Sequence, residues 1–194
     1  MWFFRKKKQK SSLKIVYYGP GLSGKTSNIK YIHDRLHKTH RSDIINVSGE
    51  MERSLSFDFS PASLEGLSHV SYRLCLYTVP GPVFYDNSRV LILKGVDGVV
   101  FVADSQAARE ESNIEFFEQL ESNLSLNGDA LKNVPLVLQY NKRDLPELLS
   151  VAELDATLNA AGRPRFEAIA SRGVGVMETL QALVALVLEK NKSR

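Results

Sequence analysis

The stretch Gly19-Pro20-Gly21-Leu22-Ser23-Gly24-Lys25-Thr26 decides the fold of this chain. Two glycines separated by four residues and followed by Lys and Thr are the pattern of a phosphate-binding loop. Residues 13–18 before the loop indicate a strand, and residues 27–40 after it have apolar side chains near helical spacing. This order of strand, loop and helix is the setting in which such a loop binds phosphate, and it disfavours an ordinary glycine-rich turn.

The residue types of the loop fit contact with a polyphosphate. Gly21 and Gly24 have no Cβ to block a phosphate and they tolerate positive φ angles. The ammonium group of Lys25 can reach the β and γ phosphates, and the hydroxyl of Thr26 can bind Mg²⁺. The positive end of the following helix adds to this attraction. We therefore expect the phosphates to meet the backbone N–H groups of the segment Leu22, Ser23, Gly24, Lys25, Thr26 and Ser27.

The length and composition predict one intracellular globular domain. The chain has 194 residues, of which 43% are hydrophobic, enough for one substantial core. Its single cysteine, Cys75, lies in an alternating run that predicts a strand, so a disulfide framework is excluded and a reducing cytoplasm fits. We expect residues 13–194 to form the domain, as a monomer.

The positive charge is concentrated in the N-terminal tail, residues 1–12. Five cations lie within the first ten residues, which leaves 20 positive against 22 negative residues in the rest of the chain. A nearly neutral body disfavours nucleic-acid binding. The tail is neither a secretory signal nor a membrane span. We expect it to be disordered; the alternative is contact with an anionic membrane surface through its cations and the aromatic residues Trp2, Phe3 and Phe4.

Strands and helices alternate along the rest of the chain. Strands are predicted at 13–18, 44–47, 55–59, 72–79, 98–104, 135–140 and 166–170, and helices at 27–40, 88–93, 109–126, 151–160 and 175–190. Near-continuous apolar strands between helices indicate an α/β fold with a mostly parallel sheet covered on both faces. Ligands bind such sheets at the carboxyl ends of the strands.

The segment Asn141-Lys142-Arg143-Asp144 follows a predicted buried strand, which places it at that edge of the sheet. The carboxylate of Asp144 can accept hydrogen bonds from N1–H and the 2-amino group of guanine, whereas adenine has no such pair of donors. Lys142 can lay its aliphatic stem across the base, and Asn141 can tie this loop to the phosphate loop. The segment therefore predicts guanine recognition rather than the solvated turn that four such residues alone would suggest.

With these motifs the chain resembles the Ras-like small GTPases and, within them, the bacterial MglA family of polarity and gliding-motility GTPases. The closer resemblance lies in Lys14-Ile15-Val16-Tyr17-Tyr18-Gly19-Pro20-Gly21, Tyr77-Thr78-Val79-Pro80-Gly81, residues 83–86, the run 91–106 that ends in Ala103-Asp104-Ser105-Gln106, and residues 139–146. The resemblance covers the chain from about residue 13 to the last predicted helix. It implies a Ras-like phosphate-loop GTPase domain that binds GTP or GDP with Mg²⁺.

The resemblance also implies roles for single residues. Ala170 matches the position whose backbone N–H binds the guanine carbonyl, and Gly81 the glycine whose N–H senses the γ phosphate. Arg53 resembles the internal arginine that neutralises transition-state charge. Magnesium is expected on Thr26 and Ser54, with Asp58 as an alternative to Ser54. Thr78 occupies the position where the wider superfamily has an aspartate, as it does in the MglA group.

Pro82 is a departure from the family pattern, which has glutamine after the switch glycine to orient the attacking water. Proline has no side-chain donor or acceptor, and it restricts the residue before it. We therefore expect GTP binding with slow hydrolysis. Three functions remain distinguishable: a hydrolysing GTP-dependent switch, a scaffold that stays bound to GTP, and a phosphate-loop ATPase or kinase, which Asp144 and Ala170 oppose.

The resemblance implies partners as well. These are an MglB-like roadblock protein and polarity or motility effectors, at a cell pole or the inner membrane surface. Two further observations from the residues have plain explanations. His33, His37 and His40 lie at helical spacing, and we interpret them as a solvated helix surface rather than a metal site. Asp104 ends a predicted strand near the site, and capping of the next loop explains it as well as a role in the site does.

Overall fold

The structure, a computed structural model, describes residues 12–47, 54–61, 66–67, 70, 72–81 and 86–192. Of the predicted tail it describes only Ser12, which is the first residue of β1 rather than part of a tail. Arg53 and Pro82 lie outside the described residues.

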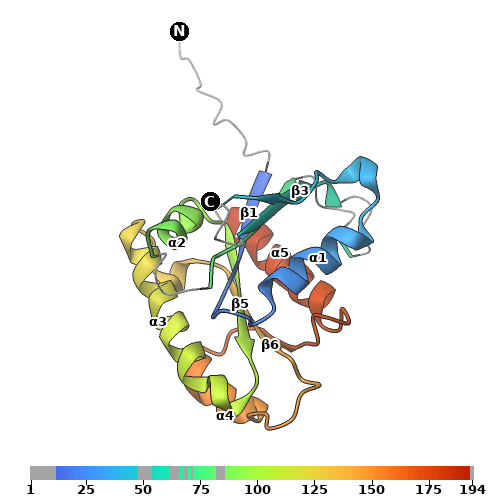
Figure 1. The fold of residues 1–194 in the computed structure, drawn as a ribbon. Helices are drawn as coiled ribbons and strands as arrows, with labels where there is room; N and C mark the ends of the chain where they lie inside the picture. The colour runs from blue at the N-terminus through green and yellow to red at the C-terminus, as the bar shows by residue number, and fades with distance from the viewer. Residues whose placement is uncertain are drawn as a thin grey trace.

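The described residues form a seven-stranded sheet in the order β2-β3-β4-β1-β5-β6-β7. The pairs β2–β3 and β3–β4 are antiparallel, and all other neighbouring pairs are parallel. Figure 1 shows β1 and β5 in the middle of the molecule. The strands are β1 (Ser12–Tyr18), β2 (Ile45–Asn46), β3 (Leu55–Phe59), β4 (Arg73–Thr78), β5 (Gly98–Asp104), β6 (Leu136–Asn141) and β7 (Arg165–Glu167).

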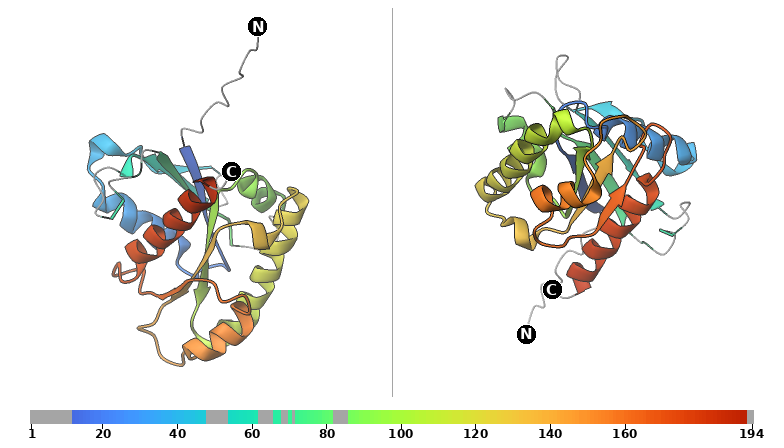
Figure 2. Two further views of the ribbon diagram at one scale, coloured as in Figure 1. Left: turned by 180° about the vertical axis from the view of Figure 1, so that it is seen from behind. Right: turned by 90° about the horizontal axis from the view of Figure 1, so that it is seen from below.

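The helices cover both faces of this sheet, as the two views of Figure 2 show. On one face α1 and α5 enclose a core, and on the other α3 and α4 enclose a second core. The predicted fold class, a Ras-like α/β domain with a mostly parallel sheet, is confirmed. The α-helices are α1 (Lys25–Arg35), α2 (Asp86–Leu93), α3 (Glu110–Leu126), α4 (Val151–Leu158) and α5 (Val176–Lys192); short 3₁₀ helices are η1 (Lys38–His40), η4 (Ala107–Arg109) and η5 (Leu131–Asn133).

The central strands are apolar because the sheet is buried on both faces. All seven residues of β5 are buried. Successive residues of β1 alternate between the two cores: Ile15 and Tyr17 pack towards α1 and α5, whereas Val16 and Tyr18 pack towards α3. Such burial of both strand faces is typical of parallel sheets between helices, and it fixes the register of β1 and hence the position of the loop that follows it.

The predicted helix 27–40 is wrong in its second half. The backbone of Leu36 is extended, with φ −88° and ψ 139°, so α1 ends at Arg35 and a separate 3₁₀ turn follows. The three histidines therefore do not share a helix face. His33 is not a solvated surface residue either, since its ring packs edge-on against Phe57 with centroids 5.0 Å apart. The described residues contain no cluster of His, Cys, Asp or Glu suited to a metal.

The predicted strand 166–170 is shorter than expected because its end is used by another loop. β7 ends at Glu167, after which the carbonyl of Ala168 accepts a hydrogen bond from Arg143 N at 3.1 Å. The backbone N–H of Ala170 donates to the side chain of Asn141 at 2.9 Å. The segment after β7 therefore leaves the sheet to meet the loop after β6.

The parallel strands end at one edge of the sheet, where the loops after β1, β5 and β6 meet. Figure 1 shows that β1 begins, and α5 ends, at the opposite end of the molecule. None of the helices among the described residues has the length and apolar character needed to cross a membrane.

Candidate nucleotide-binding site

The phosphate loop runs from the end of β1 to the start of α1. Gly24 is the N-cap of α1, with a left-handed backbone at φ 107°. A Cβ on Gly24 would lie 2.0 Å from Nδ2 of Asn141, closer than any two such atoms can come. Glycine is therefore required at this position both for its φ angle and for the approach of the next loop. It leaves the first N–H groups of α1 directed at the predicted phosphate position.

Gly21 differs from the prediction, because it does not have a positive φ angle. The left-handed residue is its neighbour Leu22, at φ 65° and with 88% of its surface exposed. Gly21 instead lies against Gly81, since a Cβ on Gly81 would come within 2.5 Å of the Cα of Gly21. The role of Gly21 is thus close contact with the segment that follows β4, which is the predicted second switch.

Lys25 is buried inside the loop that it is predicted to serve. Its Nζ donates to the carbonyl of Gly19 at 2.8 Å and to that of Pro20 at 2.6 Å. Burial, and secondly the positive charge of Arg89, lower the pKa of Lys25 to about 7. The two carbonyl groups carry no net negative charge, so they do not neutralise the ammonium group. An anionic ligand would neutralise it and would therefore stabilise the charged form strongly.

Asn141, the last residue of β6, joins three loops. Its Nδ2 donates to the carbonyl of Ser23 in the phosphate loop at 2.7 Å. Its Oδ1 accepts the backbone N–H of Ala170, from the loop after β7. The predicted tie between the base loop and the phosphate loop is therefore present in the structure. The N–H of Ala170, predicted to bind a guanine carbonyl, is already donated to this side chain.

Lys142 follows with a left-handed backbone at φ 66° and extends its ammonium group to Asp104. The distance from Nζ to Oδ2 is 2.5 Å, and the carboxylate of Asp104 is almost fully buried at the end of β5. The other carboxylate oxygen accepts the N–H of Gln106 at 3.2 Å, so the predicted loop cap is present. Sequence reasoning missed the ion pair, which fixes the head of Lys142.

Asp144 lies at the rim of the same edge. Its Oδ2 is 3.6 Å from Nη2 of Arg172, a residue that is largely exposed. Such a long, exposed ion pair contributes little stability. The carboxylate can therefore exchange this partner for two donors of a ligand at small cost.

The predicted magnesium ligands are not equally placed. Thr26 is partly exposed in the first turn of α1, whereas Ser54 is fully buried before β3. The alternative ligand Asp58 is paired with Arg73, with Oδ2 2.7 Å from Nε, and lies beside Cys75, away from the ligand edge of β4.

Thr78 supports the sheet beside the switches. It is fully buried at the end of β4, and its Oγ1 accepts the backbone N–H of Leu55 at 2.8 Å. The hydroxyl thus anchors the start of β3, directly after Ser54. The predicted catalytic positions Arg53 and Pro82 flank this region but lie outside the described residues.

Two arginines add positive charge to the site, and sequence reasoning assigned them no role there. Nη2 of Arg109 donates to the carbonyl of Gly21 at 3.0 Å. Arg89, on α2, is fully buried and its guanidinium lies over the ring of Phe116 at 5.1 Å. The sequence did contain one signal, because Arg109 is the N-cap of α3, where a positive charge is unfavourable. Together with Lys25 these groups favour an anion.

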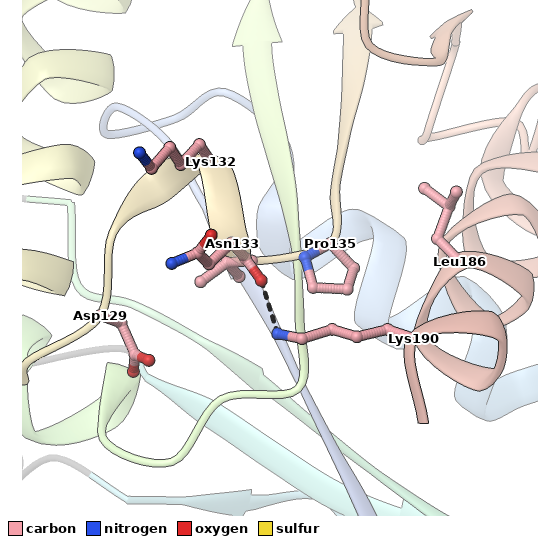
Figure 3. A pocket seen from close by; sticks show the side chains of 7 residues that line it. Asp129, Lys132, Asn133, Pro135, Leu186 and Lys190 are labelled. Carbon is pink, nitrogen blue, oxygen red and sulfur yellow. Dashed lines mark hydrogen bonds between the residues drawn. The ribbon is translucent and has the colours of Figure 1, made fainter. Parts of the chain in front are cut away.

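A hollow lies at the other end of the molecule, between η5 and α5. Its volume is about 480 Å³, and Nζ of Lys190 reaches across it to the carbonyl of Asn133 at 2.5 Å, as Figure 3 shows. Its lining also contains Asp129, Lys132 and Leu186. It has neither a glycine-rich loop nor a helix N-terminus, so the edge of the sheet is the better candidate site.

Comparison with known proteins gives a relative over nearly the whole chain. The chain is 50% identical over 192 residues to the mutual gliding-motility protein MglA of Myxococcus xanthus (strain DK1622). The match covers 99% of this chain and 98% of that protein. No protein-family model matches the chain.

Proposed function

Because this chain belongs to the MglA family, we propose that it is a guanine-nucleotide-dependent switch that acts in cell polarity or gliding motility. The phosphate loop holds the polyphosphate of GTP or GDP, and Asp144 selects guanine. The supporting observation is Asn141, whose two hydrogen bonds bring the phosphate loop, the base loop and the Ala170 segment together. We further propose that residues 13–194 act as one GTPase domain.

Lys25 neutralises charge on the β and γ phosphates, and the N-terminus of α1 orients them. Thr26 and Ser54 would hold Mg²⁺, and the ion would supply positive charge that neutralises the phosphates. Lys142, fixed at Asp104, lies along the guanine ring. Gly81, in contact with Gly21, responds to the γ phosphate, so that binding of GTP changes the second switch.

Isothermal titration calorimetry with GDP, GTP and ATP tests the binding. We expect both guanine nucleotides to bind at least about a hundredfold more tightly than ATP, since two hydrogen bonds to a carboxylate are lost with adenine. Equal or tighter binding of ATP would contradict the proposal and favour a phosphate-loop ATPase or kinase.

Hydrolysis is proposed to be slow because Pro82 cannot orient water. Arg53 supplies charge stabilisation, but without a positioned nucleophile its effect on turnover is limited. The variant P82Q tests this role, with P82A as the control that removes the ring without adding an amide. We expect release of phosphate from GTP to rise at least about tenfold in P82Q and to stay near the wild-type rate in P82A. A wild-type rate equal to that of P82Q would contradict slow hydrolysis.

Pro82 also favours a second candidate function, a scaffold that stays bound to GTP. The nucleotide that co-purifies with the protein separates the two candidates. A switch is isolated mostly with GDP or as a mixture, whereas a scaffold is isolated with GTP and retains it over hours. Addition of an MglB-like roadblock protein, the partner that we propose, then tests whether hydrolysis rises.

The family also suggests the surroundings in which the switch works. We propose a cytoplasmic monomer that binds an MglB-like protein and motility or polarity effectors, with no role for nucleic acid. The tail up to residue 11 is proposed to be disordered, and the alternative is contact with an anionic inner membrane surface. Sedimentation with vesicles containing anionic lipid, compared for the full chain and a chain lacking residues 1–11, tests that contact.

A further inference from the structure

Arg109 contacts the phosphate loop from outside the recognised motifs. Its Nη2 is 3.0 Å from the carbonyl oxygen of Gly21, the residue that also lies against Gly81. The side chain is about one-third exposed, at 36%, so its guanidinium is partly shielded from water. A hydrogen bond from a charged donor to a backbone carbonyl in such a setting is among the stronger ones.

The local structure does not explain this arginine. It is the N-cap of α3, yet its side chain caps no N–H group of that helix. A cation at a helix N-terminus opposes the helix dipole, and the residue types preferred there are Ser, Thr, Asp and Asn. Arg109 is also the last residue of η4, and its guanidinium is used outside both helices, at the carbonyl of Gly21.

Asp104 links Arg109 to the base loop. Its Oδ2 is 2.5 Å from Nζ of Lys142 and 3.9 Å from Nε of Arg109. Two cations from different segments thus share one carboxylate that is 1% exposed. A buried carboxylate needs paired charge, so both side chains are held in place by it. The contacts run from Gly21 through Arg109 and Asp104 to Lys142.

We propose that Arg109 is a positioning residue of the nucleotide site, which sets the phosphate loop against the base loop through Asp104. This inference rests on the proposed function, because it assumes that both loops bind one guanine nucleotide. Asn141 donates a neutral hydrogen bond to the carbonyl of Ser23, and Arg109 donates a hydrogen bond from a charged group to the carbonyl of Gly21, two residues earlier in the loop. With both ties the loop is held on two sides before the ligand arrives, which reduces the entropy lost on binding.

The test measures the dissociation rate of N-methylanthraniloyl-GDP from wild type, R109A, D104N and the double variant. We expect R109A to dissociate about tenfold faster, the effect of losing one charge-assisted hydrogen bond that is partly exposed. In the D104N background the same change is expected to have an effect of about twofold or less, because Arg109 then lacks its anchor. R109K, which keeps the charge but not the forked geometry, is expected to lie between wild type and R109A.

The control is R165A. Arg165 lies on β7, away from the site, and its Nε is 2.6 Å from Oδ2 of Asp155. Its rate should equal that of wild type. A dissociation rate for R109A within twofold of the wild-type rate would overturn the inference. It would also be overturned if the double variant dissociated faster than wild type by the product of the two single-variant factors, because Arg109 and Asp104 would then act independently. If R109A does not fold, R109Q carries the same expectation as R109A. Failure of wild type itself to bind GDP would instead contradict the proposed function.

Discussion

The two halves of the sheet hold the candidate site in different ways. On the parallel side, after β1, β5 and β6, side chains reach between loops: Asn141 joins three of them, and Asp104 holds Lys142. On the antiparallel side, β3 joins β4 through the backbone ladder, the exposed ion pair of Asp58 with Arg73, and near the site one buried hydroxyl, that of Thr78. β2 at that edge has two residues, both exposed.

The difference separates recognition from response. Buried side-chain contacts between loops fix the parallel side, where base and phosphate bind, because breaking any of them leaves a buried polar group without its partner. The antiparallel side carries Ser54 and leads to Gly81, which are the predicted switch residues. Among the described residues, the side-chain contact near the site on this side is one neutral hydrogen bond, from Leu55 N to Thr78 Oγ1. A rearrangement of the antiparallel side therefore costs less free energy than a rearrangement of the parallel side.

The largest expected effect comes from removing the tie on the parallel side. N141A deprives both Ser23 O and Ala170 N of their partner. We expect the free energy of unfolding in urea to fall by about 2–4 kcal/mol and GDP affinity, measured by calorimetry, to fall at least about a hundredfold. The control is N159A, which breaks contacts to Arg163 at the end of α4. It should lower stability without changing GDP affinity; an equal loss of affinity would contradict a special role for Asn141.

The second prediction concerns the selectivity for the base of the nucleotide rather than the stability of the fold. In D144N an amide replaces the carboxylate, so one donor faces a position where guanine also has a donor. We expect GTP affinity to fall about a hundredfold and xanthosine triphosphate, with an acceptor at that position, to bind better than GTP. Competition against N-methylanthraniloyl-GDP measures both. Unchanged preference for GTP would show that Asp144 does not read the base.

The third prediction concerns Lys25 and pH. Its pKa of about 7 lies below that of the unfolded chain, so the unfolded state binds more protons between about pH 7 and 10.5, and stability rises with pH across that range. We expect K25M to remove this slope and to stabilise the nucleotide-free protein at pH 7 while abolishing tight GTP binding. Urea titrations at several pH values check the slope. A parallel pH dependence in K25M and wild type would contradict the assignment.

The smallest expected effect tests the antiparallel side. T78V keeps the shape of the side chain and removes the acceptor for Leu55 N. We expect a loss of about 1–2 kcal/mol in unfolding free energy, with GDP affinity within about threefold of wild type. T157V is the control, because its exposed hydroxyl bonds only within α4. A loss of GDP affinity in T78V as large as in N141A would show that the two halves are not separate.

The sequence predicted most of the fold because each central strand has a clear apolar run. The bounds of β3 and β5 agree with the prediction, since both strands lie between polar or glycine-containing segments. The helix after the phosphate loop was predicted too long, because an apolar Leu36 continues the periodicity although its backbone is extended. Periodicity alone does not report such a break.

For the site, the sequence motifs located the phosphate loop and the base loop. The predicted contact of Asn141 with the phosphate loop is present as a hydrogen bond to Ser23. The contacts of Asp104 and Arg109 were missed because they depend on distance in space between β5, η4 and the base loop. A single cation at a helix start carries too weak a signal to name its partner. The roles of Arg53, Pro82 and the ligand-binding residues stay predictions.

The close approach of Gly24 and Asn141 has a consequence for how this protein can evolve. A side chain at residue 24 would occupy the space of the Asn141 amide, and that amide bonds to Ser23, 118 residues away in the chain. A substitution at Gly24 can therefore be accommodated only together with a displacement or a replacement of Asn141, so the phosphate motif constrains the base motif.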